Sequence, residues 1–406
     1  MKNAQISLLT AGRDKPYALG LASALIAAGV HFDFIGSDGV DSPELHGNPQ
    51  VDFLNLRGDQ SIDAGTAQKI WRVLLYYLRL VVYAAAARPK IFHILWNNKF
   101  EFFDRTALML YYKLLGKKIV FTAHNVNAAE RDANDSWLNR ATLKFQYRLC
   151  DHIFVHTEKM KGELVSGFGV SADKASVIPF GINNTAPDSG MTTLEARKKL
   201  GLNGRDKMLL FFGNIAAYKG LGFLVEAFEA AAGTDKELRL VIAGRPKGAE
   251  DYWRGLLEKI NASPVRGKIN LKIEYVPDAE TEIYFKAADV LVLPYTRIFQ
   301  SGVLSLGYSF GLPALAADVG SLKDEIIEGK TGFIFPAENP PELARTIRNY
   351  FESDLYRKLD FHRKEIRGFA NDRYSWGKVA AVTVAVYSKL SRPETNNRPR
   401  CAAEKT

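Results

Sequence analysis

Short apolar segments alternate with stretches of helical periodicity along this chain, and that alternation limits its fold more than any other feature. In the first half, strand-like segments fall at residues 5–10, 31–36, 51–56, 91–95, 118–122 and 152–156. Stretches with the apolar spacing of a helix lie between them, for example 15–29 and 67–87. Alternating strands and helices are typical of βαβ units. The sequence therefore predicts an α/β fold with a parallel sheet.

The pattern is interrupted once and then resumes. Residues 183–191 collect Asn, Thr, Pro, Asp, Ser and Gly without periodicity, which is typical of a linker. Strands are then expected at 207–212, 238–243, 269–274 and 289–293, with helices at 219–232, 249–261 and 279–288. A length of 406 residues favours two domains. We predict domains at 1–185 and 186–375, a last helix at 376–390 and a disordered tail at 391–406.

Cysteine usage and the N-terminus bear on the cellular compartment. The two cysteines, Cys150 and Cys401, lie far apart in the sequence and lack neighbouring ligands at zinc-site spacing. Residues 1–10 carry too short an apolar stretch for a secretory signal. We therefore expect a protein of the reducing cytoplasm.

The first segment suited to chemistry is a strand, a glycine loop and a helix start. An apolar strand ends at Phe212-Gly213, and Lys219-Gly220 opens an apolar helix. Free backbone N–H groups and the helix dipole favour an anion at such a helix start, and a lysine adds a positive charge. The segment can hold a diphosphate, although glycine occurs in βα loops of many parallel α/β proteins for structural reasons alone.

A second segment of this kind follows the strand at 290–293. Residues 300–304, Gln-Ser-Gly-Val-Leu, open a helix that ends at Gly311, before a buried strand at 314–317. Ligands of open α/β sheets bind beyond the carboxyl ends of the strands. Two helix starts suited to anions in one domain therefore indicate a phosphorylated ligand.

The order of these segments resembles the retaining glycosyltransferases of family 4, which have the GT-B fold of two facing Rossmann-like domains. The resemblance is carried by Phe212-Gly213 through Lys219-Gly220, Ile242 to Pro246, Tyr275-Val276-Pro277, Ala287 to Val290, Ser309 to Pro313 and Val177 to Gly181. It implies that the C-terminal domain binds a nucleotide sugar and the N-terminal domain binds the acceptor. The last helix would cross back to brace the N-terminal domain.

The sequence departs from the family at two places in the donor site. Asn214 stands where the family usually has an arginine that acts with Lys219 on the diphosphate. Ile298 and Leu306 stand at the positions of two family glutamates, and Gln300, Ser301 and Tyr308 are the nearby polar residues. The resemblance assigns donor binding to Gly12, Gly213, Asn214, Gly244, Arg245, Val276, Pro277, Gln300, Ser301, Gly302, Val303 and Leu304.

In the N-terminal half, His124 and Asn125 follow the strand at 118–122. Family members often have a histidine here that contacts the donor sugar, so the resemblance makes His124 catalytic alongside Lys219. The alternative is a hydrogen-bonded structural histidine, which we expect for His93 and His156. The loops after the first and fourth strands face the same cleft and predict acceptor contacts for Arg13, Asn98 and Lys99, and Asn125, beside His124, is expected to contact the acceptor too. Each of these residues could instead be merely solvated.

Positive charge is concentrated between Lys69 and Lys118, where ten lysines and arginines face two acidic residues. The apolar part of this segment, 73–87, is shorter than the roughly 20 residues that span a bilayer. Aromatic residues among the basic ones predict a helix lying on an anionic membrane, the alternative being a solvated basic face. Nucleic-acid binding, suggested by an isoelectric point near 9.2, is not expected because no recognised motif is present.

The resemblance implies a bacterial glycosyltransferase of cell-surface polysaccharide, exopolysaccharide or glycolipid synthesis. Its partners would be a nucleotide-diphosphate sugar, a glycan or lipid-linked acceptor, and the inner face of the plasma membrane. We expect no cofactor and no metal, because no Asp-x-Asp occurs and a lysine with helix dipoles can replace a divalent ion. The alternatives are a GT-B epimerase or phosphorylase, or a catalytically silent sugar-nucleotide-binding subunit.

Overall fold

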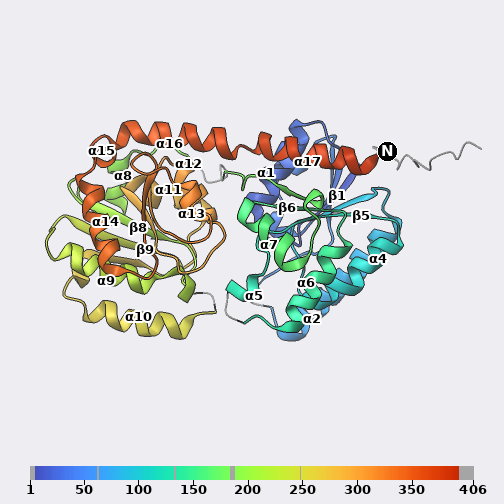
Figure 1. Ribbon diagram of the computed structural model, residues 1–406, viewed down its shortest axis with the longest axis horizontal. Coiled ribbons are helices and arrows are strands. Elements are labelled where there is room, and N and C mark those ends of the chain that lie inside the picture. Colours follow the sequence, from blue (N-terminus) through green and yellow to red (C-terminus); the bar gives the residue numbers. More distant parts are fainter. Residues whose placement is uncertain (1–4, 62–63, 132–133, 183–187, 247, 393–406) are drawn as a thin grey trace, which may run out of the picture.

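The computed structural model describes residues 5–61, 64–131, 134–182, 188–246 and 248–392. The predicted boundary at 185/186 and the tail beyond residue 392 lie outside these residues. Two sheets form the frame of the molecule, and every strand pair in them is parallel (Figure 1). The prediction of an α/β fold with two Rossmann-like sheets is confirmed.

The first sheet has the strand order β3-β2-β1-β4-β5-β6-β7. Its strands are β1 (Ile6–Leu9), β2 (Phe32–Gly36), β3 (Val51–Asn55), β4 (Ile91–Ile94), β5 (Lys118–Thr122), β6 (His152–Val155) and β7 (Ala175–Val177). Its helices are α1 (Lys15–Ala27), α2 (Thr66–Ala86), α3 (Glu101–Phe103), α4 (Met109–Leu114), α5 (Ala128–Arg131), α6 (Trp137–Leu149) and α7 (Glu158–Phe168).

The second sheet has the strand order β10-β9-β8-β11-β12-β13. Its strands are β8 (Lys207–Phe212), β9 (Leu238–Ala243), β10 (Ile269–Lys272), β11 (Val290–Leu293), β12 (Ala314–Ala317) and β13 (Gly332–Phe335). The helices are α8 (Thr193–Lys199), α9 (Leu221–Ala232), α10 (Glu250–Ala262), α11 (Asp278–Ala287), α12 (Gly302–Ser309), α13 (Leu322–Glu325), α14 (Pro340–Glu352), α15 (Asp354–Arg357) and α16 (Leu359–Tyr374).

Each sheet is buried on both faces, which explains why its strands are apolar throughout rather than alternating. The strand β11, for example, reads Val-Leu-Val-Leu and is buried at all four positions. Two apolar clusters flank the first sheet and two flank the second. The loops that follow the carboxyl ends of the strands are where ligands of parallel α/β sheets bind, so they are the place to look for a site.

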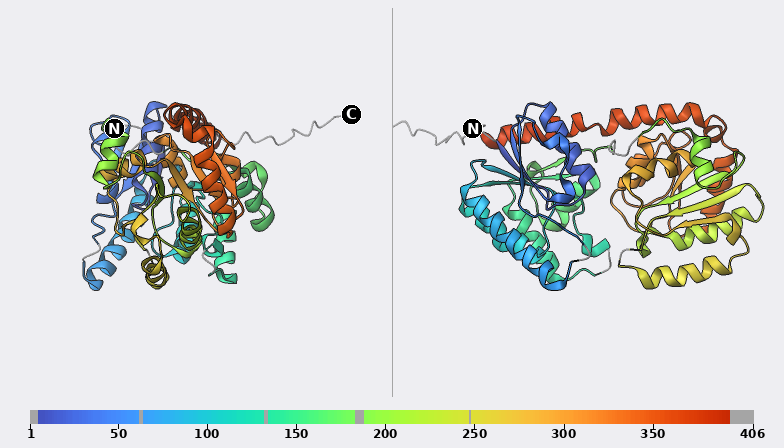
Figure 2. Two further views of the ribbon diagram at one scale, coloured as in Figure 1. Left: turned by 90° about the vertical axis from the view of Figure 1, so that its left-hand side faces the viewer. Right: turned by 180° about the vertical axis from the view of Figure 1, so that it is seen from behind.

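The last helix, α17 (Trp376–Ser391), runs back along the first sheet beside α1, as Figures 1 and 2 show. The hydroxyl of Tyr387 lies 2.6 Å from Nδ1 of His93, and a side chain at Gly20 or Gly181 would collide with the Trp376 ring. These contacts place the helix against the N-terminal half, where the sequence predicts it. Among the described residues, no helix is long and apolar enough to cross a membrane.

Candidate active site

The two predicted anion-binding segments lie side by side, because β8 and β11 are neighbours in the second sheet. Nζ of Lys219 donates a hydrogen bond of 2.8 Å to the Tyr295 hydroxyl, which lies 3.3 Å from Oγ of Ser301. Ser301 is the N-cap of α12, and its Oγ accepts from the backbone N–H of Leu304. A buried cation and a helix N-terminus therefore meet at one point, as a diphosphate site requires.

The Lys219 side chain is buried, with an exposed fraction of 8%. Its Nζ lies 4.2 Å from the centre of the Tyr295 ring. No carboxylate of the described part of the chain forms an ion pair with it. A buried ammonium without an acidic partner is costly, so an anionic ligand is the expected partner.

The expected start of the helix after β8 is wrong by two residues. Residues Ala217–Lys219 form a 3-10 turn, and α9 begins only at Leu221. Gly220 separates the two with φ of 65°, a left-handed conformation that favours glycine. A Cβ at Gly220 would lie 1.8 Å from the carbonyl oxygen of Pro294, which keeps the turn close to the loop after β11.

Glycines bring the other donor-side loops together. A Cβ at Gly244 would lie 1.8 Å from the carbonyl oxygen of Gly213, so the loops after β8 and β9 touch through their backbones. Val303 is 3.4 Å from the Cβ position of Gly213. The Arg245 guanidinium lies 5.4 Å from the centre of the Tyr275 ring, Val276 is buried, and Pro277 is the N-cap of α11.

The residues at the family's glutamate positions are packed rather than available to a ligand. Ile298 is partly buried against an apolar cluster, and Leu306 is buried within it. The Tyr308 hydroxyl donates to the carbonyl oxygen of Glu325, so this tyrosine stabilises the fold. Gln300 differs from them, because its Oε1 is buried without a hydrogen-bond partner among the described residues.

Asn214 is exposed and lines a groove of about 1690 Å³ beside this site. The groove runs between α9 and α10, and Asn134, from the other half of the chain, also lines it. Lys219 and Ser301 are not among the described residues that line the groove. It is therefore adjacent to the cation and the helix start rather than built around them.

His124 follows β5 and lies in an aromatic cluster. Its ring stacks on Trp96 at 4.4 Å between centres, and the edge of Tyr17 meets it at 4.6 Å. Burial, together with the nearby His156 and His93, holds its pKa well below the usual value. His124 is therefore neutral at physiological pH.

The hydrogen bonds of the histidine pair fix which nitrogen of His124 is free. Nδ1 of His156 lies 3.2 Å from the Ile178 carbonyl oxygen, which only accepts, so this nitrogen carries the proton. Burial lowers the pKa of His156 to about 4, so its Nε2 is unprotonated and accepts from Nδ1 of His124 at 3.1 Å. Nε2 of His124 is then an acceptor, and it is buried without a partner among the described residues.

Phe180 connects this cluster to the donor side. Its ring centre lies 6.2 Å from that of His124. The Phe180 ring is also 3.4 Å from the position that a Cβ would take at Gly302, the first residue of α12. The acceptor nitrogen of His124 and the helix start at Ser301 therefore belong to the same region between the two sheets.

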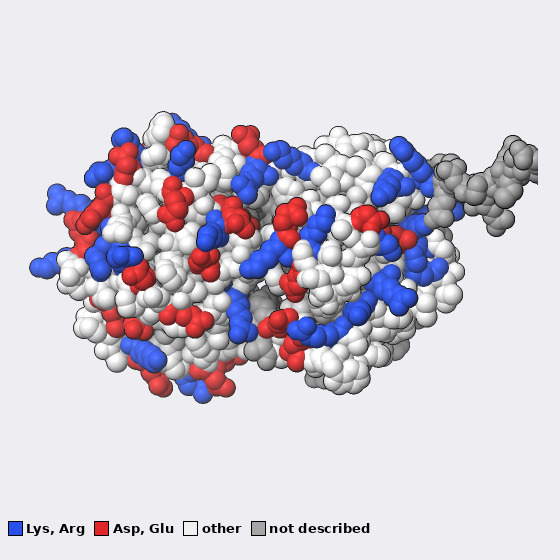
Figure 3. Space-filling model, viewed as in Figure 1, with Lys and Arg blue, Asp and Glu red and all other residues white. Residues whose placement is uncertain are grey.

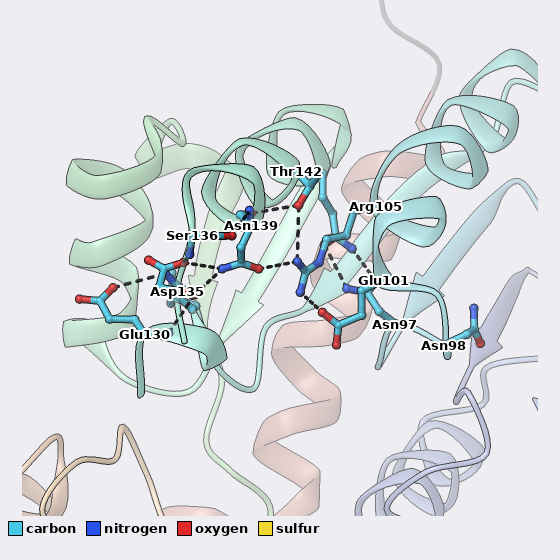
Figure 4. Close-up of polar contacts among 12 residues, drawn as sticks. Asn97, Asn98, Glu101, Arg105, Glu130, Asp135, Ser136, Asn139 and Thr142 are labelled. Atoms are coloured by element: carbon cyan, nitrogen blue, oxygen red, sulfur yellow. Dashed lines mark hydrogen bonds and ion pairs between the residues drawn. The ribbon is translucent and has the colours of Figure 1, made fainter. Parts of the chain in front are cut away.

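The loops after β4 and β5 are held by a polar network, which Figure 4 shows. The Arg105 guanidinium donates to Oδ1 of Asn139 at 2.7 Å and pairs with Glu101. The amides of Asn97 and Gln146 exchange hydrogen bonds. These bonds fix the loops on α6, so the surface they present is preorganised.

The predicted acceptor residues differ in how accessible their side chains are. Asn98 is buried, and its amide is paired with Tyr76 and Asp104. Lys99 and Arg13 are exposed, Asn125 is half-buried, and Gly12 has φ of 62° in the loop after β1. Arg13, Lys99 and Asn125 are thus accessible to an acceptor, whereas the Asn98 side chain is used within the protein.

Comparison with known families decides the class of protein. Residues 192–364 match the model of glycosyl transferases group 1, and residues 16–185 match that of glycosyltransferase family 4. The chain is a group 1, family 4 glycosyltransferase. Sucrose-phosphate synthase (tll1590) from Thermosynechococcus elongatus has the same GT-B fold, with a TM-score of 0.74 at 18% identity over 95% of this chain and 99% of that one.

Two further proteins are similar to this glycosyltransferase. Anabaena Alr3699/HepE, in complex with UDP and glucose, has a TM-score of 0.73 at 17% identity, covering 95% of this chain and all of that one. D-inositol 3-phosphate glycosyltransferase of Corynebacterium glutamicum (strain R) is 25% identical over 66% of each chain. The glycosyltransferase thus spans just under two thirds of the length of this curated relative.

Four residues of the glycosyltransferase's site were not predicted as part of it. Tyr295 lies two residues beyond the end of β11, and a polar residue shortly after a buried strand is a usable signal. Trp96 and His156 lie just after β4 and β6, Tyr17 lies in α1, and no local pattern indicates that the three pack around His124.

Proposed function

We propose that this glycosyltransferase moves a sugar from a nucleotide-diphosphate donor to a glycan or lipid-linked acceptor, with retention of configuration. Its role would be in the synthesis of bacterial cell-surface polysaccharide or glycolipid, including exopolysaccharide, at the cytoplasmic face of the membrane. The observation that carries the proposal is Lys219, a buried cation that lacks an acidic partner among the described residues and lies beside the start of α12.

Lys219 is suited to the charge that develops when the sugar leaves. Cleavage of the bond between the anomeric carbon and the diphosphate oxygen places negative charge on the leaving group. The ammonium and the N–H groups at the start of α12 would stabilise that charge without reorganising. We expect the reaction to proceed without a metal or other cofactor, and unchanged turnover in the presence of a chelator would support this.

His124 is suited to the sugar rather than to the diphosphate. Its unprotonated Nε2 can accept a hydrogen bond from a sugar hydroxyl and so orient the donor. No residue matched to the family supplies a carboxylate nucleophile, so we propose that the departing phosphate assists attack on the same face of the sugar. Retention would follow from that geometry.

The donor is tested by incubating the purified chain with a panel of nucleotide sugars and measuring release of the nucleoside diphosphate. The relative that binds UDP and glucose makes UDP-glucose the first compound of the panel. We expect turnover of at least one donor. Binding without turnover, even with glycan and lipid-linked acceptors present, would favour a silent sugar-binding subunit instead.

Membrane contact is the second part of the proposal, and α2 carries it. Its outward face presents a row of apolar side chains at helical spacing, each more than half exposed: Ile70, Trp71, Leu74, Leu78 and Val82. Further exposed apolar residues lie on the neighbouring helices, among them Leu114 on α4 and Trp137 on α6. Figure 3 shows a row of lysines and arginines across the lower part of the N-terminal half, with an uncharged surface below it. An apolar face with a basic edge fits an anionic bilayer.

Two of the arginines expected to bind lipid are engaged within the protein. Arg72 pairs with Asp59, and Arg79 donates to the carbonyl oxygen of Leu56. The sharper test therefore changes the apolar row: the double variant Trp71→Ser, Leu78→Ser should lose sedimentation with phosphatidylglycerol vesicles. Leu194→Ser, which changes an equally exposed leucine on α8, is the control. Undiminished binding of the double variant would refute this membrane surface.

A further inference from the structure

Three cations follow strands of the first sheet, whereas Lys219 belongs to the second. Arg13 follows β1, Arg57 follows β3, and Lys99 follows β4. These strands end at the same edge of the first sheet, where β2 and β1 lie between β3 and β4. Nη2 of Arg13 donates to the carbonyl oxygen of Asn98 at 3.3 Å, which brings this arginine next to Lys99.

The two arginines are close together and are held by neutral groups. Arg57 donates to the carbonyl oxygen of Ala11, two residues before Arg13, and its guanidinium lies 5.2 Å from the centre of the Tyr76 ring. Burial lowers the pKa of Arg57, and the positive charge of Arg13 adds to the shift. Within the described ranges, neither arginine nor Lys99 forms an ion pair.

The charge of Asp104 acts on Arg57, but within the described residues no ion pair joins the two. Asp104 is buried behind Asn98 and Tyr77, and its Oδ1 accepts from the Asn98 amide at 3.1 Å and the Tyr77 hydroxyl at 3.0 Å. An arginine has five N–H donors, so one bonded backbone carbonyl leaves most of them free. The positive charges of Arg13 and Arg57 act unfavourably on each other, and an anion between them would remove that repulsion.

We propose that Arg13, Arg57 and Lys99 form a subsite for a phosphate group of the acceptor. The inference rests on the proposed function and narrows its acceptor to a phosphorylated molecule, either a lipid phosphate or a free phosphorylated sugar. The subsite is separate from the donor cation, because Lys219 belongs to the loop after β8 of the second sheet.

The position of α2 relates the subsite to the membrane surface. Tyr76 is on the buried face of α2, under Arg57, whereas Trp71 and Leu78 are on the exposed face of the same helix. A lipid phosphate held by Arg57 would therefore lie one helix diameter from the apolar row, roughly 10 Å. Its hydrocarbon chain could stay in the bilayer while its sugar reached the cleft.

The test measures binding of inorganic phosphate to the full chain by calorimetry. The double variant Arg13→Gln, Arg57→Gln should bind at least about tenfold more weakly, since each charged hydrogen bond contributes about 1.5–3 kcal/mol. Arg72→Gln removes an arginine that is already paired with Asp59, and it should bind like the natural chain. Phosphate is titrated with a nucleoside diphosphate already present in excess, so that the donor site around Lys219 is occupied and the measured binding belongs to the subsite.

Unchanged phosphate affinity in the double variant, or an equal loss in Arg72→Gln, would overturn the proposal. If Arg57→Gln fails to fold, Arg13→Gln alone is decisive, because Arg13 is exposed and should still lose severalfold in affinity. Binding to vesicles with and without phosphatidic acid distinguishes a lipid phosphate from a free phosphorylated sugar. If the double variant binds more weakly than the natural chain, and only to the vesicles with phosphatidic acid, the ligand is a lipid phosphate. If the double variant and the natural chain bind both kinds of vesicle equally, the acceptor is a soluble phosphorylated molecule. Failure of every nucleotide sugar to react would refute the proposed function while leaving this phosphate binding in place.

Discussion

Replacing Lys219 by methionine should separate activity from stability. Methionine retains the apolar stem of lysine but removes the ammonium, which is buried beside Tyr295 and has no acidic partner among the described residues. Losing one preorganised charge at a developing anion costs about 2–4 kcal/mol of transition-state stabilisation, so kcat/KM should fall by roughly a hundredfold or more.

The stability of the same variant should not fall. An unpaired buried ammonium is unfavourable in the free protein, so the free energy of unfolding of Lys219→Met should equal or exceed that of the natural chain. Tyr295→Phe is the matched control: it keeps the ring that lies 4.2 Å from Nζ and removes only the hydroxyl. Its cost should be about 1 kcal/mol. Initial rates and urea unfolding measure both quantities, and a Lys219→Met enzyme with undiminished kcat/KM would refute the role of the lysine.

Three further predictions concern the histidines and the glycine loops. His124→Ala should lower turnover by about a hundredfold while the affinity for nucleoside diphosphate changes little. His156→Phe should also lower turnover, because it removes the hydrogen bond that keeps the proton on Nδ1 of His124. Equal losses of turnover and of nucleotide affinity would refute this role of His124. Burial lowers the pKa of His93 to about 3 and the pKa values of His152 and His156 to about 4. Between pH 6.5 and pH 4 only the unfolded chain binds protons at these histidines, so the free energy of unfolding should decrease as the pH falls through this range. A free energy of unfolding that does not change with pH there would contradict the prediction. Gly244→Ala should destabilise the protein by about 1–3 kcal/mol and weaken donor binding, because the added Cβ meets the Gly213 backbone. Gly255→Ala, on the open side of α10, is the control and should be neutral or stabilising. Thermal unfolding measures the stability of both variants.

The strands could be predicted well because parallel strands buried on both faces are continuously apolar. Residues 118–122, 207–212 and 238–243 form strands within the predicted bounds. The short strands β7 and β13 were not among the predicted strands. β7 has only three residues. β13 begins with a glycine, Gly332, at φ of 155°, and a glycine there reads as a turn signal in the sequence.

The site was predictable where it is local in sequence. Ser301 caps a helix that starts where the sequence predicts, because a serine before an apolar helical stretch has few other roles. The role of Lys219 stays a prediction, but its element is wrong in the sequence analysis, since its turn depends on the contact between Gly220 and Pro294. The cluster around His124 combines residues more than 100 positions apart, such as Tyr17 and His156, and only the tertiary structure brings them together.

The two places where the chain passes between the sheets are bonded to each other. The backbone N–H of Ile182 donates to the Tyr374 carbonyl at 2.9 Å, and Nε1 of Trp376 donates to the Ile182 carbonyl at 2.9 Å. Two connections joined in this way act as one hinge, so we expect the halves to swing about a single axis near Trp376 rather than to slide or separate. Such a swing would change the distance between His124 and Lys219 while leaving the apolar clusters of each half intact.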